Sequence, residues 1–73
     1  MQLDQIGASV TNLAPEEARG FINNHKEGTY TLLDVRQPGE YEKSRIPGAR
    51  LVPLPQLADR LEELDPQRPI ITY

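Results

Sequence analysis

Two charged residues at the end of an apolar segment are the chain's strongest candidates for chemistry. Asp34 and Arg36 lie in the run Leu-Leu-Asp-Val-Arg at residues 32–36, which ends a predicted strand. Open α/β sheets bind ligands just beyond the carboxyl ends of their strands, and alternation along a strand places both side chains on one face. The two residues could serve as an acid and a base beside a bound anion. They could instead be structural, with Arg36 paired to Glu40 or Glu42 and Asp34 capping a nearby loop.

A second group of candidates follows a few residues later. Tyr41 could hydrogen-bond a substrate, or it could fill the core with its hydroxyl at the surface. Arg45 could attract an anionic substrate or remain a solvated charge. Ile46, Pro47 and Gly48 could position a loop against a site, but Pro and Gly here predict a rigid bend that enters the next strand.

The composition excludes several classes of site. The 73 residues include no cysteine, which excludes a disulfide, a thiolate metal site and a thiol nucleophile. His25 is the only histidine, so a histidine metal cluster is excluded too, and its place at a helix end predicts a capping role. The sequence therefore predicts neither a metal nor a cofactor.

The charge pattern argues against nucleic acid and membrane partners. The net charge is −3, both signs are interspersed, and the aromatic residues are one Phe and three Tyr. The first residues, 1–6, show neither a basic region nor an apolar run, so neither a signal peptide nor a membrane anchor is expected. A cytoplasmic protein is the expectation.

The elements that must position the candidate residues alternate between helix and strand. Residues 1–9 show little periodicity and are expected to form a flexible lead-in. The remaining elements are predicted as a short strand or tether at 10–13, a helix at 13–25, a strand at 30–35, a turn at 37–39 with one helical turn at 40–44, a strand at 49–52, a helix at 54–64, a turn at 65–69 and a strand at 70–73.

Residue types also predict details of the two full helices. Pro15 suits the first position of the first helix, with Ala14 as a weak N-cap and Gly28 as the residue after the C-cap. The second helix is expected to bury one stripe of leucines, namely Leu54, Leu57, Leu61 and Leu64.

This alternation predicts an α/β fold with a largely parallel sheet. Such a sheet needs helices on both faces. Two full helices and one helical turn are too few for that, so an element or two is expected to be missing from the chain or supplied by another chain.

Three of these segments together resemble the first half of a single-domain rhodanese-like protein. They are Leu-Leu-Asp-Val-Arg at 32–36 with Glu40 and Tyr41, Ile-Pro-Gly-Ala at 46–49, and Val-Pro at 52–53. The resemblance covers about residues 10–73. It implies a doubly wound parallel sheet and the transfer of sulfane sulfur from an anionic donor such as thiosulfate to a thiophilic acceptor. In the family, the sulfur is carried as a persulfide on a Cys that immediately follows the strand matched by residues 70–73.

The sequence departs from the family pattern at two places. The Cys expected just after Tyr73 is absent, and Arg45 stands where the family usually has a His. By position, the resemblance implies that Asp34 and Arg36 flank the site, that Glu40 is the partner of Arg36, and that Tyr73 directly precedes the nucleophile.

The leading hypothesis is that residues 10–73 are the N-terminal part of one rhodanese-like domain, truncated before the catalytic loop. The intact parent would transfer sulfur, and this chain alone would be inactive because it has no catalytic residue of its own. The rival hypothesis is a non-catalytic interaction or regulatory module that completes its fold with a second copy or with the missing C-terminal portion. A third is the related phosphatase branch, which is distinguished by the length of the Cys loop.

Overall fold

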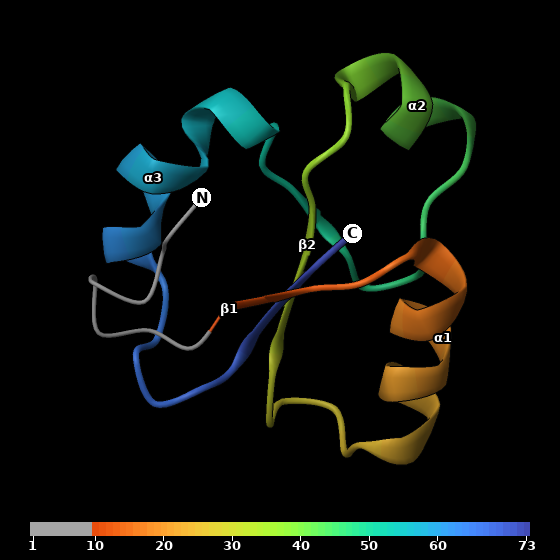
Figure 1. The fold of residues 1–73 in the computed structure, drawn as a ribbon, viewed down its shortest axis with the longest axis vertical. Coiled ribbons are helices and arrows are strands. Elements are labelled where there is room, and N and C mark those ends of the chain that lie inside the picture. Colours follow the sequence, from red (N-terminus) through yellow and green to blue (C-terminus); the bar gives the residue numbers. More distant parts are fainter. Residues whose placement is uncertain (1–9) are drawn as a thin grey trace.

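A parallel β-sheet runs through the middle of the molecule (Figure 1). The computed structural model describes residues 10–73, so the predicted lead-in at 1–9 lies outside the described residues. In this part of the chain the sheet has four strands, β1 (Val10–Asn12), β2 (Thr31–Asp34), β3 (Arg50–Leu51) and β4 (Ile70–Thr72), in the order β1-β4-β2-β3. All three pairings are parallel, which confirms the α/β fold with a parallel sheet.

The two inner strands are buried on both faces. Leu33 and Ile70 belong to one apolar cluster, while Leu32 and Ile71 belong to a second cluster on the opposite face. Successive side chains of a strand point to opposite faces, so a continuous apolar run is what a strand covered on both sides requires. The last predicted strand is accordingly an inner, parallel member of the sheet.

Helix α1 (Pro15–Asn24) covers the face with the second cluster. It begins with Pro15 as predicted, and the N-cap Ala14 has no side chain that could accept a hydrogen bond. The backbone N–H of Ala14 instead donates to the Glu17 carboxylate at 3.0 Å. The prediction that Gly28 follows the C-cap is wrong, because α1 ends at Asn24 and Gly28 lies in the next turn, with φ 91°.

The predicted continuous helix at 54–64 is wrong, since the segment forms three short pieces. These are a 3₁₀ turn η2 (Leu54–Gln56), one α-turn α3 (Leu57–Arg60) and a second 3₁₀ turn η3 (Leu61–Glu63). The Leu54 N–H donates to the Val35 carbonyl at 3.0 Å, which ties the start of the segment to the end of β2. A 3₁₀ turn has about three residues per turn, so the leucine stripe loses its α-helical phase.

The predicted leucine stripe is therefore only partly buried. Leu57 and Leu61 are 1% and 4% exposed and pack on the first cluster, with Leu64 half-buried beside them. Leu54 is 50% exposed, which contradicts its predicted place in the core.

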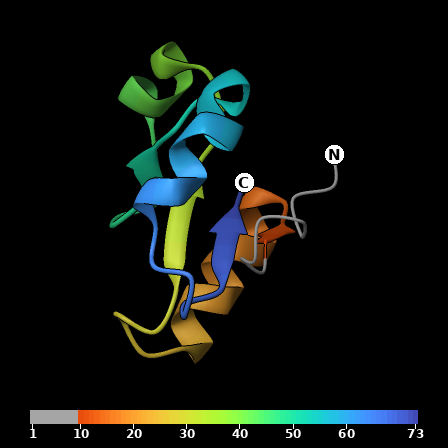
Figure 2. The same cartoon turned by 90° about the vertical axis from the view of Figure 1, so that its left-hand side faces the viewer.

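Helix α2 (Pro38–Lys43) lies beyond the carboxyl ends of the inner strands (Figure 2). The sequence predicted a turn at 37–39 and one helical turn at 40–44. The structure merges them into one six-residue helix, because Pro38 occupies the first helical position and has no N–H that would lack a partner there.

Both faces of the inner strands have a helical cover. Figure 1 shows α1 on one side of β2 and β4 and the 54–63 segment on the other. The expectation that two helices leave a face bare is thus wrong for the inner strands. The edge strand β1 differs, because Thr11 and Asn12 are exposed.

Candidate functional site

Two inner strands bring the candidate residues together at the carboxyl edge of the sheet. Asp34 ends β2, and Tyr73 directly follows β4. The Val35 N–H donates to the Tyr73 carbonyl at 3.0 Å, and the Tyr73 N–H donates to the Leu33 carbonyl at 3.2 Å. Tyr73 therefore continues the sheet ladder, and Asp34 lies on the face where Tyr73 packs.

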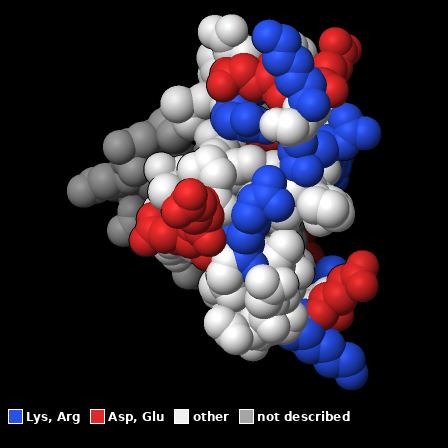
Figure 3. All heavy atoms as spheres, turned by 90° about the vertical axis from the view of Figure 1, so that its right-hand side faces the viewer, with Lys and Arg blue, Asp and Glu red and all other residues white. Residues whose placement is uncertain are grey.

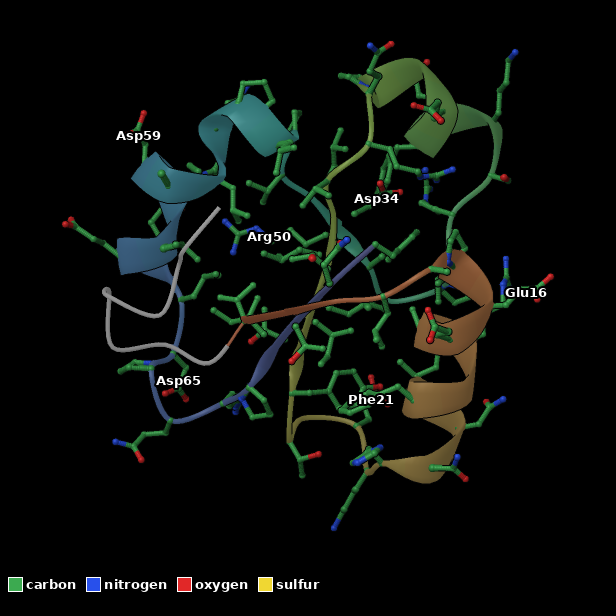
Figure 4. The ribbon with its side chains drawn as sticks, viewed as in Figure 1. Glu16, Phe21, Asp34, Arg50, Asp59 and Asp65 are labelled. Atoms are coloured by element: carbon green, nitrogen blue, oxygen red, sulfur yellow. The ribbon has the colours of Figure 1, made fainter. Side chains whose placement is uncertain are left out.

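Asp34 and Arg36 form a closely bonded ion pair. The Arg36 Nε donates to Oδ1 and Oδ2 of Asp34 at 3.0 and 3.1 Å, and Nη2 donates to Oδ2 at 2.7 Å. The backbone N–H of Arg36 adds a further bond to Oδ1 at 2.9 Å. The Asp34 side chain is fully buried and that of Arg36 is 25% exposed, so only the guanidinium of the pair contacts solvent. Figure 4 shows Asp34 between the sheet and α2.

The pair keeps both groups ionised near neutral pH. Burial acts to raise the pKa of the Asp34 carboxyl, but the hydrogen bonds and charge of Arg36 outweigh burial, and the pKa lies below its usual value. The hydrogen bond to Asp34 in turn raises the pKa of Arg36. A carboxylate with a lowered pKa is a poor general acid and a weak base, so the geometry favours the structural interpretation of these two residues.

The expected ion pair between Arg36 and Glu40 is not formed. The Glu40 carboxylate accepts a hydrogen bond from the backbone N–H of Gln37 at 3.3 Å. This bond gives a partner to a backbone donor at the start of α2. Arg36 uses its other Nη2 bond on the Ser44 carbonyl at 2.6 Å. The guanidinium thus links the end of β2 to the chain that leaves α2.

Tyr73, which follows the neighbouring strand β4, also holds the chain that leaves α2. Its phenol oxygen accepts the backbone N–H of Ile46 at 3.0 Å, and the Arg36 guanidinium carbon lies 5.5 Å from its ring centroid. Tyr73 is 6% exposed. Burial and the charge of Asp34 raise the pKa of this phenol despite the opposing bond from Ile46, so it stays protonated at neutral pH.

The other candidate residues shape the connection between α2 and β3. The Tyr41 hydroxyl donates to the Ala49 carbonyl at 3.2 Å, and the Arg45 guanidinium lies 4.4 Å from the Tyr41 ring centroid. The Ala49 N–H donates to the Ile46 carbonyl at 3.0 Å, with Gly48 at φ 88°. Pro followed by a Gly with positive φ matches a type II turn, which is the predicted rigid bend.

Sequence reasoning missed the contacts that join the loop to the sheet. The bond between Ile46 and Tyr73 spans 27 residues, and the bond between Arg36 and Ser44 spans eight. Neither has a local sequence signal, because each depends on which strands become neighbours in the sheet. His25 lies away from this edge as the C-cap of α1, and its Nδ1 bonds the Phe21 carbonyl at 2.8 Å.

The edge offers an ion pair and a neutral phenol. Within residues 10–73, no three His, Cys, Asp or Glu side chains cluster closely enough to hold a metal ion. Across the same residues, no helix has the length and apolar character needed to cross a membrane. Figure 3 shows that positive and negative side chains are mixed on the face that carries α1.

Comparison of the sequence with known protein families assigns the chain to one of them. The sequence model of the rhodanese-like domain matches residues 15–73. The chain therefore belongs to the rhodanese-like domain family, as the sequence motifs predicted.

Three curated proteins are similar to parts of this chain. The HTH-type transcriptional regulator Rv0324 of Mycobacterium tuberculosis is 41% identical over 63 residues, which cover 82% of this chain and 28% of the regulator. The uncharacterized protein YqhL of Bacillus subtilis is 45% identical over 42 residues, covering 58% of this chain and 33% of YqhL. An uncharacterized 16.5 kDa protein of Synechococcus elongatus is 38% identical over 50 residues, covering 68% of this chain and 33% of that protein. The matched segments thus span a third or less of each relative.

Proposed function

We propose that the chain is the scaffold part of a rhodanese-like sulfurtransferase domain and that the chain alone does not transfer sulfur. The observation that carries the proposal is the shared edge of β2 and β4, where Asp34, Arg36 and Tyr73 meet. Family membership supports sulfur transfer as the activity of an intact domain. The sequence contains no cysteine, so this chain has no thiol that could carry a persulfide.

The proposed reaction of an intact domain has two displacements. A thiolate attacks the sulfane sulfur of thiosulfate, the S–S bond of thiosulfate breaks, and sulfite leaves while a persulfide forms. Cyanide or another thiophilic acceptor then takes the outer sulfur, and the thiolate is regenerated. In this scheme Asp34, Arg36 and Tyr73 hold the rim of the site, and none of them reacts.

A sulfurtransferase assay tests the proposal directly. The 73-residue chain, incubated with thiosulfate and cyanide, is expected to release thiocyanate only at the buffer rate. A chimera that joins the Cys-bearing segment of an active rhodanese-like protein to Tyr73 should release thiocyanate, and a Cys-to-Ala chimera should not. Thiocyanate release in proportion to the concentration of the 73-residue chain would refute the proposal.

A non-catalytic regulatory module is the second candidate. One relative is an HTH-type transcriptional regulator, and the matched segment covers 28% of it. The exposed residues of β1 lie at a sheet edge, where another chain could add a strand. On this reading the chain associates with a second copy or with a complementary C-terminal portion of a domain.

Sedimentation of matched variants tests the association. Thr11→Lys places a charge on the edge strand and should shift an oligomer toward monomer, whereas Gln67→Lys, in the exposed turn before β4, should not. A wild-type chain that stays monomeric at high concentration, alone and with a C-terminal rhodanese-like segment, would rule the module out. The proposal includes a cytoplasmic location, which cell fractionation would test.

A further inference from the structure

A cavity of about 500 Å³ that is open to solvent lies between the C-terminal end of α1, the start of β2 and the turn at residues 47–48. Its apolar lining includes Leu32, which is buried, and Ile22, which is half-buried. Glu27 and His25 belong to its exposed rim. The surface that lines this space is more polar than apolar, with Leu32 and Ile22 as its apolar part, so it suits a small ligand that has both a polar group and a short apolar body.

The polar groups at this rim favour a positively charged ligand. Glu27 is one of the lining residues and brings a carboxylate to this region. Helix α1 ends here with its partial negative charge, and its last turn contains no basic residue. The cation next to Glu27 in sequence, Lys26, is not among the lining residues.

His25 adds a further acceptor. Its Nδ1 lies 2.8 Å from the Phe21 carbonyl, which can only accept, so Nδ1 carries the proton in the neutral ring. Nε2 is then an acceptor. The ring also stacks on Phe21 with centroids 3.8 Å apart, so its orientation is fixed.

An aromatic wall completes the cavity. Tyr30 lines it, and the Tyr30 ring packs edge-on against Phe21 with centroids 5.4 Å apart. Figure 4 shows Phe21 reaching from α1 toward the sheet. An aromatic ring can attract a cation through its face, and Tyr30 is the ring of this pair that belongs to the lining.

From these features we propose that the cavity binds an organic ammonium ion, namely a primary amine on a small apolar body. The ammonium group would lie at the rim with Glu27 and the end of α1, and the apolar body would lie against Ile22, Tyr30 and Leu32. This site does not rest on the proposed sulfur transfer, because most of its residues lie at the end of α1 and the start of β2, and none of Asp34, Arg36 and Tyr73 is part of its lining.

Amide chemical shifts of the 73-residue chain test the site with three probes of matched shape near neutral pH. Phenethylamine, a cation, should shift the amides of residues 22–30 and 48 in a saturable way. The neutral 2-phenylethanol should bind about fivefold or more weakly, and the anionic phenylacetate more weakly still. Equal affinities for the amine and the alcohol, or amine-dependent shifts centred elsewhere, would overturn the proposal.

A matched pair of variants separates a specific site from general attraction to an acidic chain. Glu27→Gln should weaken the binding of phenethylamine about fivefold. Glu62→Gln makes the same change in net charge at an exposed residue of η3 and should leave this binding unchanged. Asn23→Trp, which fills the cavity from the exposed side of α1, should abolish the shifts. Equal effects of E27Q and E62Q, or undiminished binding to N23W, would refute the site.

Discussion

At the scale of single residues, the carboxylate of Asp34 decides how the edge of the sheet is built. A fully buried carboxylate is costly unless it is paired and hydrogen-bonded, and Arg36 supplies both the charge and the donors. Arg36 then reaches Ser44 and Tyr73 reaches Ile46, so the loop that follows α2 is attached to two strands. The ion pair is thus a structural joint of the edge.

The ion pair predicts a specific pH dependence of stability. The pKa of Asp34 is lowered in the folded state, so its contribution to stability is complete above the unfolded-state pKa of about 4 and is lost as pH falls through the folded-state pKa. Urea unfolding from pH 7 down to pH 2 should show this loss. Arg36→Gln removes the charge and the guanidinium bonds that oppose burial of Asp34 and keeps the backbone bond of residue 36, so the chain should be less stable at pH 7 and lose less stability on acidification. Arg19→Gln, an exposed change on α1, should keep the wild-type profile.

The hydrogen bond from Ile46 to Tyr73 predicts a second effect on stability. Tyr73→Phe leaves the buried N–H of Ile46 without an acceptor and should lower the free energy of unfolding by about 1–3 kcal/mol. Tyr30→Phe is the control, since Tyr30 is half-buried and its hydroxyl makes no hydrogen bond among the described residues. Chemical denaturation measures both variants. Equal stability of Y73F and wild type would show that water replaces the phenol.

At the scale of elements, the segment that covers the first cluster is built from fragments of helix. The bond from Leu54 to Val35 fixes where the segment leaves the sheet, and two 3₁₀ turns flank the single α-turn. The resulting helical phase places Leu57 and Leu61 against the sheet and leaves Leu54 half-exposed to solvent. The segment therefore makes a smaller contact than a continuous helix with four buried leucines.

Two leucine truncations distinguish the observed segment from a continuous helix. Leu57→Ala opens a cavity under a side chain that is 1% exposed and should cost about 2–5 kcal/mol. Leu54→Ala removes a side chain that is 50% exposed and should cost less than about 1 kcal/mol. Denaturant unfolding of both variants gives the two values. Similar large losses would mean that Leu54 is buried in solution, as the sequence pattern suggested.

At the scale of the whole molecule, two thin apolar clusters share one sheet. Leu33 and Ile70 serve one cluster while Leu32 and Ile71 serve the other, so the inner strands hold both layers together. Among the described strands, the edge strand β1 pairs only with β4, through its ladder and a bond from the Thr72 hydroxyl to Asn12 at 2.8 Å, and Val10 packs against the first cluster. Stability is therefore expected to be highest at the centre of the sheet.

Hydrogen exchange should show this gradient. Amides of β2 and β4 are expected to exchange most slowly, and those of β1 should exchange faster because that edge strand contributes only the partly buried Val10 to a cluster. Residue-resolved exchange monitored by NMR measures the order. Protection of β1 equal to that of β4 would indicate that β1 is covered in solution, which would favour the association proposed for its edge.

The sequence by itself determined the family, the α/β class and the order of the elements. Continuous apolar runs mark the buried strands, Pro15 marks a helix start, and Pro47 with Gly48 marks a turn, because these signals depend only on a residue and its near neighbours. It also excluded a thiol nucleophile within this chain, since no cysteine is present.

Only the tertiary structure decided which residues the elements bring together. Arg36 pairs with Asp34 and not with Glu40, and this choice is made by the folded geometry. The bond from Ile46 to Tyr73 likewise depends on the distance between segments far apart in the chain. The same holds for the exposure of Leu54 and for the cavity beside His25 and Glu27. Local patterns encode local conformation, whereas pairing and burial are set when the strands take their neighbours in the sheet.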